Sequence, residues 1–491
     1  MSDLFDPFVQ RDTMRSVRAL LFCVLLAHAP SSAETPMTSE AILYRKIQVP
    51  DEFVTKDEEG RTYGGDIRIG DLTGNGVMDF VVFKSVAKFK PCFIGAFAMD
   101  GTVLWSVGDK DLTVPKKKGE GVFKTESPGR PGPVTIYDID GDGSAEVIAL
   151  MIDSSAKATE EWRAEDMDIV VLDGKTGQVK KRVSDPTLRE TSAYHEGKRY
   201  HANYCHQRPL IANLRGTKQP QDFVIKMGAD LLAYDNELNL LWRYENKWNA
   251  YPDHSAYIPS VGDVDGDGRD EVNGGNFVLD SDGTPLWERF LGRNLDSVLV
   301  EEWDGDAANG KEAIASAGGH VLDAKGNVLL QLGIDTVPHG QEIRCGNLRD
   351  DSDGPELVIR YDGHKPELLI ASHEGKVVER FKVDSSPNQT GMELIHWNGR
   401  GKPSLIYSPA ALYDGRGKKA VTFPGLPKPS GGKMGWYHCF PADVCGDEPE
   451  EVVLYDPYSD CVYVYTAPPL DEAAYKGYRH TPRQYNARLM D

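Results

Sequence analysis

Residues 137–143 read Tyr-Asp-Ile-Asp-Gly-Asp-Gly and residues 262–268 read Gly-Asp-Val-Asp-Gly-Asp-Gly, followed by Glu146 and Glu271 respectively. In both stretches a short apolar strand runs into an Asp-rich turn and continues as a β-rich strand. Six weaker copies bring the number of copies to eight, and they begin at Asp71, Asn213, Asp304, Asn347, Asn398 and Asp443. A phrase repeated this often predicts an architecture in which each copy is one structural unit.

A second phrase follows most of these copies: an apolar strand, a turn with Asp and Gly, and a further strand. It occurs, for example, at residues 100–101, 282–283 and 414–415. Two hairpins per unit make a four-stranded blade. The chain has 49 Gly and 30 Pro among 491 residues, which suits an all-β chain rich in turns. We therefore predict an all-β propeller of seven or eight four-stranded blades, with eight favoured, over residues 61–467.

The number of blades depends on the two ends of the chain, because terminal blades are often completed by strands from both ends. Residues 34–60 form an N-terminal segment, in which residues 42–49 could supply the closing strand. Residues 468–491 follow the last repeat as a C-terminal tail. The count of eight repeat units favours eight blades, and a closing strand of this kind leaves seven open.

The first residues are typical of an export signal. Two arginines precede the apolar run 19–29, which is too short to span a bilayer, and small residues follow it. We predict a signal peptide over residues 1–33, with Met14 as an alternative start. The protein is then secreted or periplasmic, without a membrane span.

Cysteine content and charge exclude some classes of function. Seven cysteines occur, one of them in the predicted signal, and none shows a CxxC spacing. Export permits disulfides, and we predict no particular pairing. The net charge of −21 argues against nucleic acid as a partner. An anionic substrate would need a locally basic site.

The Asp-rich turns predict bound cations. Carboxylates at alternate positions, with Gly allowing a tight turn, place several hard oxygens around one point, which suits calcium. No helix follows and no Glu occupies a twelfth position, so the turns are not EF-hands. We interpret the calcium as structural rather than catalytic. The predicted ligands are Asp138, Asp140, Asp142, Glu146, Asp263, Asp265, Asp267 and Glu271.

Propeller geometry also predicts where a site would lie. The loop entering each innermost strand and the loop joining the second and third strands open at the same end of the ring. Counting back from the Asp-rich turns places in the first group Arg130, His206, His254, Asp296, His339, Thr390, Tyr437 and His438. The second group contains Lys84, Lys226, Asn276, His320, Arg360, His364, Tyr407 and Tyr455. An acidic chain thus gathers His, Arg, Lys and Tyr at one end.

Two chemistries fit such a ring of side chains. In β-elimination on a uronic acid, Arg or Lys pairs with the carboxylate. His or Tyr then removes the proton at the neighbouring carbon, and Tyr or His protonates the departing oxygen. Alternatively, three neutral imidazoles facing one axis could hold zinc, and the two are compatible. The sequence contains neither HExxH nor GxSxG, which gives little support to a metalloprotease or a serine hydrolase.

Three short sequence motifs resemble those of a known family. They are His-Ser-Ala-Tyr at 254–257 running into the Asp-rich stretch, Pro-His-Gly-Gln-Glu at 338–342, and Asn-Gln-Thr-Gly-Met-Glu at 388–393. In them the chain resembles the propeller polysaccharide lyases, particularly the ulvan lyases. It resembles more distantly the rhamnogalacturonan lyases with Asp-rich calcium loops. The latter carry a β-rich domain before the propeller, and only a short segment precedes the first repeat here, which favours the ulvan type.

The resemblance implies that a His and a Tyr act as base and acid and that an Arg neutralises the uronate. By position, the expected catalytic residues are His206, His254 and Tyr251. The guanidinium role falls on Arg208, Arg344 or Arg360, and the expected substrate-binding residues together are Arg130, Arg208, Lys226, His339, Arg344, Arg360 and His364.

We therefore expect an exported lyase that cleaves an anionic, uronate-containing polysaccharide, ulvan-like or rhamnogalacturonan-like, by β-elimination. One alternative is a non-catalytic, calcium-stabilised propeller with integrin-like repeats that binds carbohydrate or protein. Another is a glycoside hydrolase on the same scaffold. A hydrolase needs two facing carboxylates, for which the predicted site offers mainly Asp253, Asp296 and Glu342.

Overall fold

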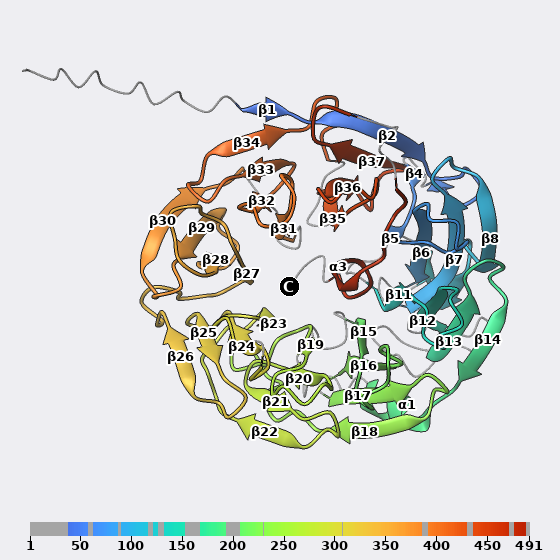
Figure 1. Cartoon of the computed structure of the whole chain (residues 1–491). Coiled ribbons are helices and arrows are strands. Elements are labelled where there is room, and N and C mark those ends of the chain that lie inside the picture. Colours follow the sequence, from blue (N-terminus) through green and yellow to red (C-terminus); the bar gives the residue numbers. More distant parts are fainter. Residues whose placement is uncertain are drawn as a thin grey trace, which may run out of the picture. The chain divides into compact units, whose positions relative to one another are not determined.

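A ring of β-sheets around a central axis makes up the protein (Figure 1). The computed structural model describes residues 38–56, 62–86, 90–115, 121–125, 132–152, 167–192, 207–228, 230–306, 308–384, 391–429, 436–470 and 476–487. In this part of the chain, seven sheets have four strands and one has five. The prediction of an all-β propeller with eight blades is confirmed.

The first four blades follow the chain from the innermost strand outward. Blade 1 consists of β5 (Asp66–Gly70), β6 (Asp79–Val86), β7 (Lys90–Ala98) and β8 (Val103–Gly108). Blade 2 consists of β11 (Val134–Tyr137), β12 (Glu146–Ile152), β13 (Met167–Asp173) and β14 (Val179–Val183). Blade 3 consists of β15 (Pro209–Ala212), β16 (Asp222–Met227), β17 (Asp230–Asp235) and β18 (Leu240–Tyr244). Blade 4 consists of β19 (Ser260–Gly262), β20 (Glu271–Asn273), β21 (Phe277–Leu279) and β22 (Pro285–Glu288).

The remaining blades close the ring. Blade 5 consists of β23 (Val298–Glu301), β24 (Glu312–Ala315), β25 (His320–Leu322) and β26 (Val328–Gln331). Blade 6 consists of β27 (Glu342–Gly346), β28 (Glu356–Arg360), β29 (Glu367–Ala371) and β30 (Val377–Lys382). Blade 7 consists of β31 (Glu393–Ile395), β32 (Leu405–Tyr407), β33 (Ala411–Tyr413) and β34 (Lys419–Thr422), with β1 (Ser39–Glu40) parallel to β34. Blade 8 consists of β35 (His438–Ala442), β36 (Glu451–Tyr455), β37 (Cys461–Thr466) and, outermost, β2 (Ile42–Gln48).

The two ends of the chain meet in blade 8. There β2 pairs antiparallel with β37, so that Ile47 lies opposite Val462. A strand from the N-terminal segment therefore supplies the outer edge of a blade whose other strands come last in the sequence. This pairing joins blades 1 and 8, whose side chains share one apolar cluster that includes Phe80, Phe97 and Phe440.

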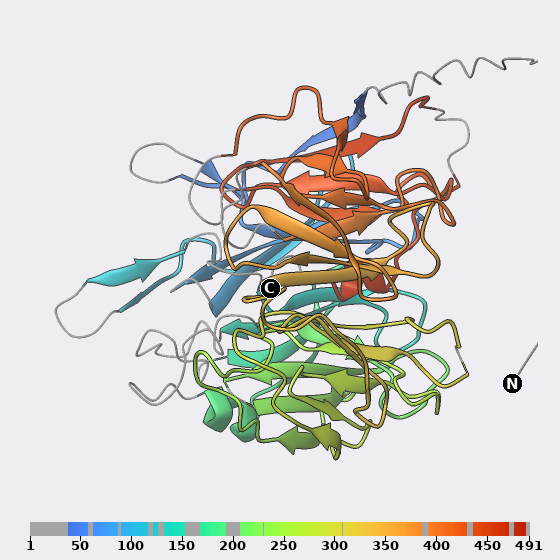
Figure 2. The ribbon, with the colours of Figure 1, turned by 90° about the vertical axis from the view of Figure 1, so that its left-hand side faces the viewer.

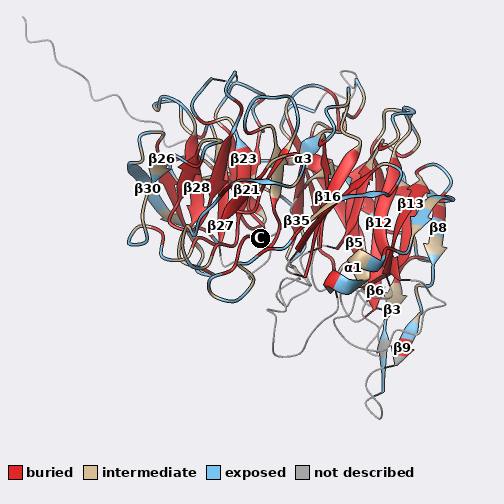
Figure 3. Ribbon diagram, turned by 90° about the horizontal axis from the view of Figure 1, so that it is seen from below, coloured by how far each residue is buried: buried red, intermediate tan, exposed pale blue. Residues whose placement is uncertain are grey.

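Burial falls from the middle strands of each blade to its outer strand (Figure 3). Every residue of β6 and β12 is buried, because both faces of these strands pack against neighbouring blades. Their sequences are accordingly near-continuous apolar runs. The outer strands β8 and β30 consist mostly of exposed and half-buried residues. The apolar core thus lies between the blades and leaves the loops at both ends of the ring for function.

The antiparallel order separates the loops into two ends of the ring. Turns that join first to second and third to fourth strands lie at one end, here called the Asp-rich end. Loops that join second to third strands, and loops that lead into the next blade, lie at the other end, here called the histidine end. The hairpin β9 (Thr113–Pro115) and β10 (Val122–Lys124) belongs to a loop of the histidine end and projects beyond the blades (Figure 2).

Short elements complete the fold. A second hairpin joins β3 (Thr55–Lys56) to β4 (Thr62–Tyr63), and α1 spans Pro186–Ser192 after blade 2. None of the helices in the described part of the chain is long and apolar enough to cross a lipid bilayer. The five described cysteines are free thiols, and four of them are buried.

The C-terminal segment lies inside the ring (Figure 1). It contains α3 (Pro482–Tyr485), and Asn486 and Ala487 after this helix are held by β15 and by Arg208 just before it. Arg208 donates to the carbonyl of Ala487 at 2.6 Å, and Asn486 exchanges two hydrogen bonds with the backbone of Ile211. Beside this segment lies a cavity of about 220 Å³, lined by charged residues that include Glu301, Lys311, Arg344, Glu393 and Arg483. The segment therefore occupies part of the axial channel.

Candidate active site at the histidine end

Three consecutive loops of the histidine end bring together two histidines and one aspartate. His254 precedes blade 4, Asp296 precedes blade 5 and His339 precedes blade 6. The two carboxylate oxygens of Asp296 lie 3.5 Å from His254 Nε2 and 3.1 Å from His339 Nε2. Asp296 thus bridges two imidazoles that are far apart in the sequence. The equivalent offsets of these residues from their Asp-rich turns were the signal for this convergence.

His254 is the buried member of this cluster. Its side chain has no exposed surface, and its Nδ1 lies 3.0 Å from the carbonyl of Ser255. A carbonyl can only accept a hydrogen bond, so Nδ1 carries the proton. Nε2 then accepts a hydrogen bond from the Tyr257 hydroxyl at 3.3 Å. The two rings are stacked with centroids 4.6 Å apart. Burial lowers the pKa of His254, which favours this neutral imidazole.

His339 is the member of the cluster that reaches solvent. Its side chain is 26% exposed, and its backbone N–H donates to the carbonyl of Tyr361 in the neighbouring loop of blade 6. That loop approaches the ring closely: a Cβ on Gly363, whose φ is +57°, would lie 3.0 Å from His339 Nδ1. The His364 ring lies 6.1 Å from the His339 ring. The exposed imidazole is therefore held by backbone on one side and by Asp296 on the other.

Tyrosine and cationic side chains surround the cluster. Tyr251 is 60% exposed, and its ring is stacked on that of His254 at 6.0 Å. Arg293, in the same loop as Asp296, pairs with Asp253 at 3.1 Å and keeps 68% of its side chain exposed. The sequence analysis did not single out Arg293. Its signal was available, because Arg293 lies three residues before Asp296 in a loop already assigned to this end.

Lys226 supports the cluster from blade 3. It is buried, and its ammonium donates to the carbonyl of Ala256 at 2.5 Å, directly after His254 and Ser255 in the chain. Burial lowers the pKa of Lys226 to about 7. This lysine therefore ties the His254 loop to β16, and it loses its charge close to neutral pH.

The buried lysine predicts a particular pH dependence of stability. In the unfolded chain Lys226 keeps its proton up to a pKa of about 10.4, whereas in the folded chain it loses the proton near pH 7. The unfolded state binds more protons between these values, so the free energy of unfolding rises with pH in that window. We expect Lys226→Met to lower the slope of the free energy of unfolding against pH by up to about 1.4 kcal/mol per pH unit. Urea unfolding from pH 7 to 10 measures this slope.

The control for this measurement is the exposed Lys365, in a loop of the same end. Lys365→Met should leave the slope as in the unmodified protein. Lys84, whose pKa burial also lowers to about 7, keeps part of the slope in every variant. An unchanged slope in Lys226→Met would show that Lys226 stays charged in the folded protein.

The three arginines predicted to neutralise a uronate are engaged elsewhere. Arg208 is buried under the C-terminal segment and also donates to Val134 O at 2.6 Å. Arg344 lines the axial cavity and pairs with Glu393 at 3.0 Å. Arg360 is 4% exposed and pairs with Glu342 at 2.9 Å. The structure thus brings His254, His339, His364, Tyr251 and Lys226 into one region, and pairs these guanidinium groups with internal acceptors. Arg130 and His206 lie outside the described residues.

Carboxylates cluster separately at the Asp-rich end. Four groups place one carboxylate oxygen per residue within 4.8 Å of each other, and they are Asp138 with Asp140 and Glu146, Asp263 with Asp265 and Glu271, Glu302 with Asp304 and Glu312, and Asp443 with Asp447 and Glu451. The first two were predicted as ligand sets, except that Asp142 and Asp267 lie outside the groups and accept backbone N–H groups. No such group in the described residues contains a histidine, so the zinc alternative gains no support.

The group in blade 4 fits a hard cation. One carboxylate oxygen of Glu271 accepts the N–H of Val264 at 2.7 Å, while the other oxygen is buried and has no hydrogen-bond partner. Burial raises the pKa of Glu271 to about 8, and the neighbouring Asp265 adds to this shift. A cation at the centre of the group would neutralise these oxygens, and oxygen ligands are those that calcium prefers. The residues that would hold it are Asp263, Asp265 and Glu271.

Together these features define an eight-bladed propeller with a His–Asp–His cluster at one end and carboxylate clusters at the other. No protein-family model matches the chain. The chain is 25% identical over 316 residues to the rhamnogalacturonan exolyase YesX of Bacillus subtilis (strain 168), covering 56% of this chain and 48% of that protein. It is 24% identical over 303 residues to the rhamnogalacturonan endolyase YesW of the same organism, covering 54% and 46%. The chain spans about half the length of the curated relatives it matches.

Solved structures share the fold. The rhamnogalacturonan lyase PL11 of Bacillus licheniformis superposes with a TM-score of 0.64 at 19% sequence identity, covering 91% of this chain and 81% of that chain. The resemblance to propeller polysaccharide lyases is therefore confirmed. The relatives found are rhamnogalacturonan lyases, which the sequence analysis had placed second to the ulvan lyases.

Proposed function

We propose that this protein is a polysaccharide lyase that cleaves a rhamnogalacturonan-type, uronate-containing polysaccharide by β-elimination at the histidine end of blades 4 to 6. The observation that carries the proposal is the Asp296 carboxylate shared by His254 and His339. The similarity to two rhamnogalacturonan lyases supports the same substrate class. A polymeric substrate is met outside the cytoplasm, so we also propose a secreted or periplasmic location.

His339 is the proposed base. The ionised carboxylate of Asp296 can only accept, so its 3.1 Å contact places the imidazole proton on Nε2 and leaves Nδ1 free to take a proton. In the reaction this nitrogen takes the proton from the carbon next to the uronate carboxylate. Asp296 then stabilises the imidazolium that forms. His254 is fully buried and acts as a positioning residue, because its ring stacks on Tyr257 and packs behind Asp296, with 3.5 Å between Nε2 and the carboxylate.

The remaining roles fall on exposed side chains of the loops that carry His254, Asp296 and His339 and of the neighbouring loop of blade 6. The electron pair of the broken C–H bond forms a double bond as the glycosidic oxygen leaves, and Tyr251 is the proposed acid that protonates that oxygen. Arg293 and His364 are proposed to neutralise the uronate carboxylate, which lowers the barrier to removing the neighbouring proton. Both are more accessible than the buried Arg208 and Arg360.

Calcium is proposed as a structural ion at the Asp-rich end. Asp263, Asp265 and Glu271 would hold it through oxygen atoms, and its charge would fasten the turn between β19 and β20. In the described residues, the carboxylate clusters and the His254–Asp296–His339 cluster lie at opposite ends of the blades, so this ion is assigned a structural role.

The proposal is tested by mixing the protein with rhamnogalacturonan, polygalacturonate and ulvan and recording ultraviolet absorbance. β-Elimination leaves an unsaturated uronate at each new chain end, so we expect absorbance to rise with rhamnogalacturonan. New reducing ends without that absorbance would indicate a hydrolase instead. Binding without any product would indicate a non-catalytic propeller. Either result contradicts the proposed function.

A further inference from the structure

The Asp-rich turns of blades 2 and 4 share one skeleton. In each, the first aspartate accepts backbone N–H groups of the following glycines, as Asp138 does from Gly141 and Gly143. Both glycines have positive φ, which a residue with a side chain rarely adopts. In each turn the glutamate that begins the second strand uses one oxygen to accept a backbone N–H of the turn. The other oxygen points to the centre of the carboxylate group.

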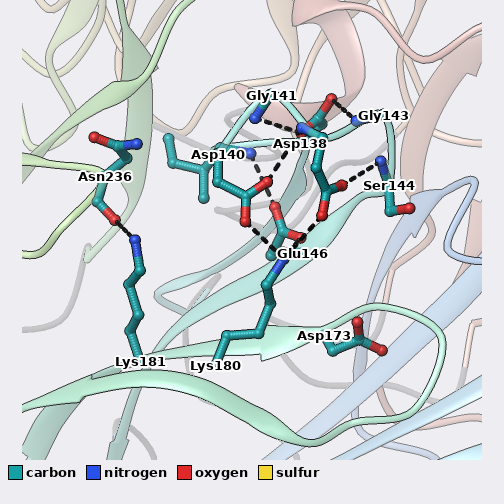
Figure 4. Close-up of polar contacts among 12 residues, drawn as sticks. Asp138, Asp140, Gly141, Gly143, Ser144, Glu146, Asp173, Lys180, Lys181 and Asn236 are labelled. Atoms are coloured by element: carbon teal, nitrogen blue, oxygen red, sulfur yellow. Dashed lines mark hydrogen bonds and ion pairs between the residues drawn. The ribbon is translucent and has the colours of Figure 1, made fainter.

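The two turns differ in what lies at that centre. In blade 2 the ammonium of Lys180 lies 2.6 Å from Asp140, 2.8 Å from Glu146 and 3.3 Å from Asp142 (Figure 4). In blade 4 the corresponding oxygen of Glu271 is buried and has no hydrogen-bond partner. One turn thus contains its own cation, and the matching turn contains carboxylates alone.

The residue at one position of a shared strand register explains why blade 2 has this cation. Every blade from 1 to 7 has a register shift between its third and fourth strands at the Asp-rich end, and in blade 2 Lys180 is the outer-strand residue left unpaired at this shift, between Val179 and Lys181. The same position in the other six blades is apolar, and it is occupied by Leu104, Leu241, Leu286, Leu329, Val378 and Ala420. In blade 4, Leu286 packs into the apolar cluster between blades. Lysine therefore stands in blade 2 at a position where the other six blades have an apolar residue.

We propose that Lys180 is a built-in cation that takes the place of a metal ion in blade 2, so that the turn at residues 138–146 binds no calcium. The three N–H donors of one ammonium face Asp140 and Glu146 of the group and Asp142 beside it, so a cation already lies among these carboxylates without a bound ion. Calcium needs oxygens at about 2.3–2.6 Å, so it and the ammonium exclude each other from the same centre. The calcium predicted from the sequence for this turn is then absent, while the turn of blade 4 still needs a bound cation to neutralise its carboxylates.

The test counts calcium bound per chain by equilibrium dialysis after chelator treatment, and it does not depend on lyase activity. Lys180→Met should bind one more calcium than the unmodified protein, because the carboxylates lose their internal cation. The matched control is Lys181→Met, since the neighbouring lysine bonds Asn236 O and Glu237 outside the group. This control should leave the calcium count unchanged.

Two further variants decide the matter if Lys180→Met fails to fold. Asp140→Asn should leave the calcium count unchanged, because blade 2 holds no calcium to lose. Asp265→Asn should lower the count by one, because blade 4 loses a ligand. The proposal is overturned if Asp140→Asn lowers the count by one, or if folded Lys180→Met binds the same amount of calcium as Lys181→Met. Failure of the proposed lyase activity would change none of these counts.

Discussion

Replacing His339 by alanine should lower kcat on rhamnogalacturonan by about 10²- to 10⁴-fold, the usual contribution of a general base. The physical reason is that His339 is the half-buried imidazole that reaches solvent and whose Nε2 proton is held by Asp296. Initial rates of ultraviolet absorbance measure the effect. Asp296→Asn should also lower kcat, and should shift the pH profile, because an amide cannot stabilise the imidazolium as a carboxylate does.

The matched control is His373→Ala. His373 lies in a turn of the same blade but at the Asp-rich end, where its ring stacks on Trp303 at 4.6 Å. This variant should keep kcat near that of the unmodified protein. Full activity of His339→Ala, with its thermal unfolding unchanged, would place the base elsewhere in the protein.

The second large effect is expected on stability. Arg360→Ala should lower the free energy of unfolding by about 3–5 kcal/mol, because it leaves the carboxylate of Glu342 buried without its charge partner. Urea unfolding monitored by tryptophan fluorescence measures the loss. The double variant Arg360→Met with Glu342→Leu should recover most of it, since no buried charge remains.

This prediction separates two roles for Arg360. The sequence analysis predicted that Arg360 binds substrate, whereas the structure pairs it with Glu342 and with Ser408 at 3.3 Å. A variant that keeps its stability but raises KM would favour the substrate role. A loss of stability, with KM unchanged at a temperature where the variant is folded, would favour the structural role.

Much of the fold could be predicted because its signals are local. The Asp-rich turns depend on residues two to five positions apart, as in the contacts of Asp138 with Gly141 and Gly143. Alternation of such turns with apolar strands is repeated along the chain, so the strand order and the separation of the two ends of the ring follow from it. The convergence of His254 and His339 was predictable for the same reason, because equivalent positions in successive blades face the same axis.

The pairing of charged groups could not be read in this way, because it depends on strands that are distant in sequence. Arg344 meets Glu393 of the next blade, and Arg208 meets a C-terminal segment that enters the ring. Neither contact has a local signal. Burial likewise separates His254 from His339, although both occupy equivalent places in the repeat.

The sequence by itself determined the all-β repeat, the Asp-rich turns and the end of the ring at which imidazoles gather. Each of these follows from contacts between residues close in sequence, which recur at equivalent positions of the blades. Only the tertiary structure decided which imidazole reaches solvent, which arginines are already neutralised and which acidic turn contains its own lysine. The physical reason is that the exposure and pairing of a charged side chain depend on the residues that the fold places beside it. Lys180, for example, reaches Glu146 only through the register of the outer strand.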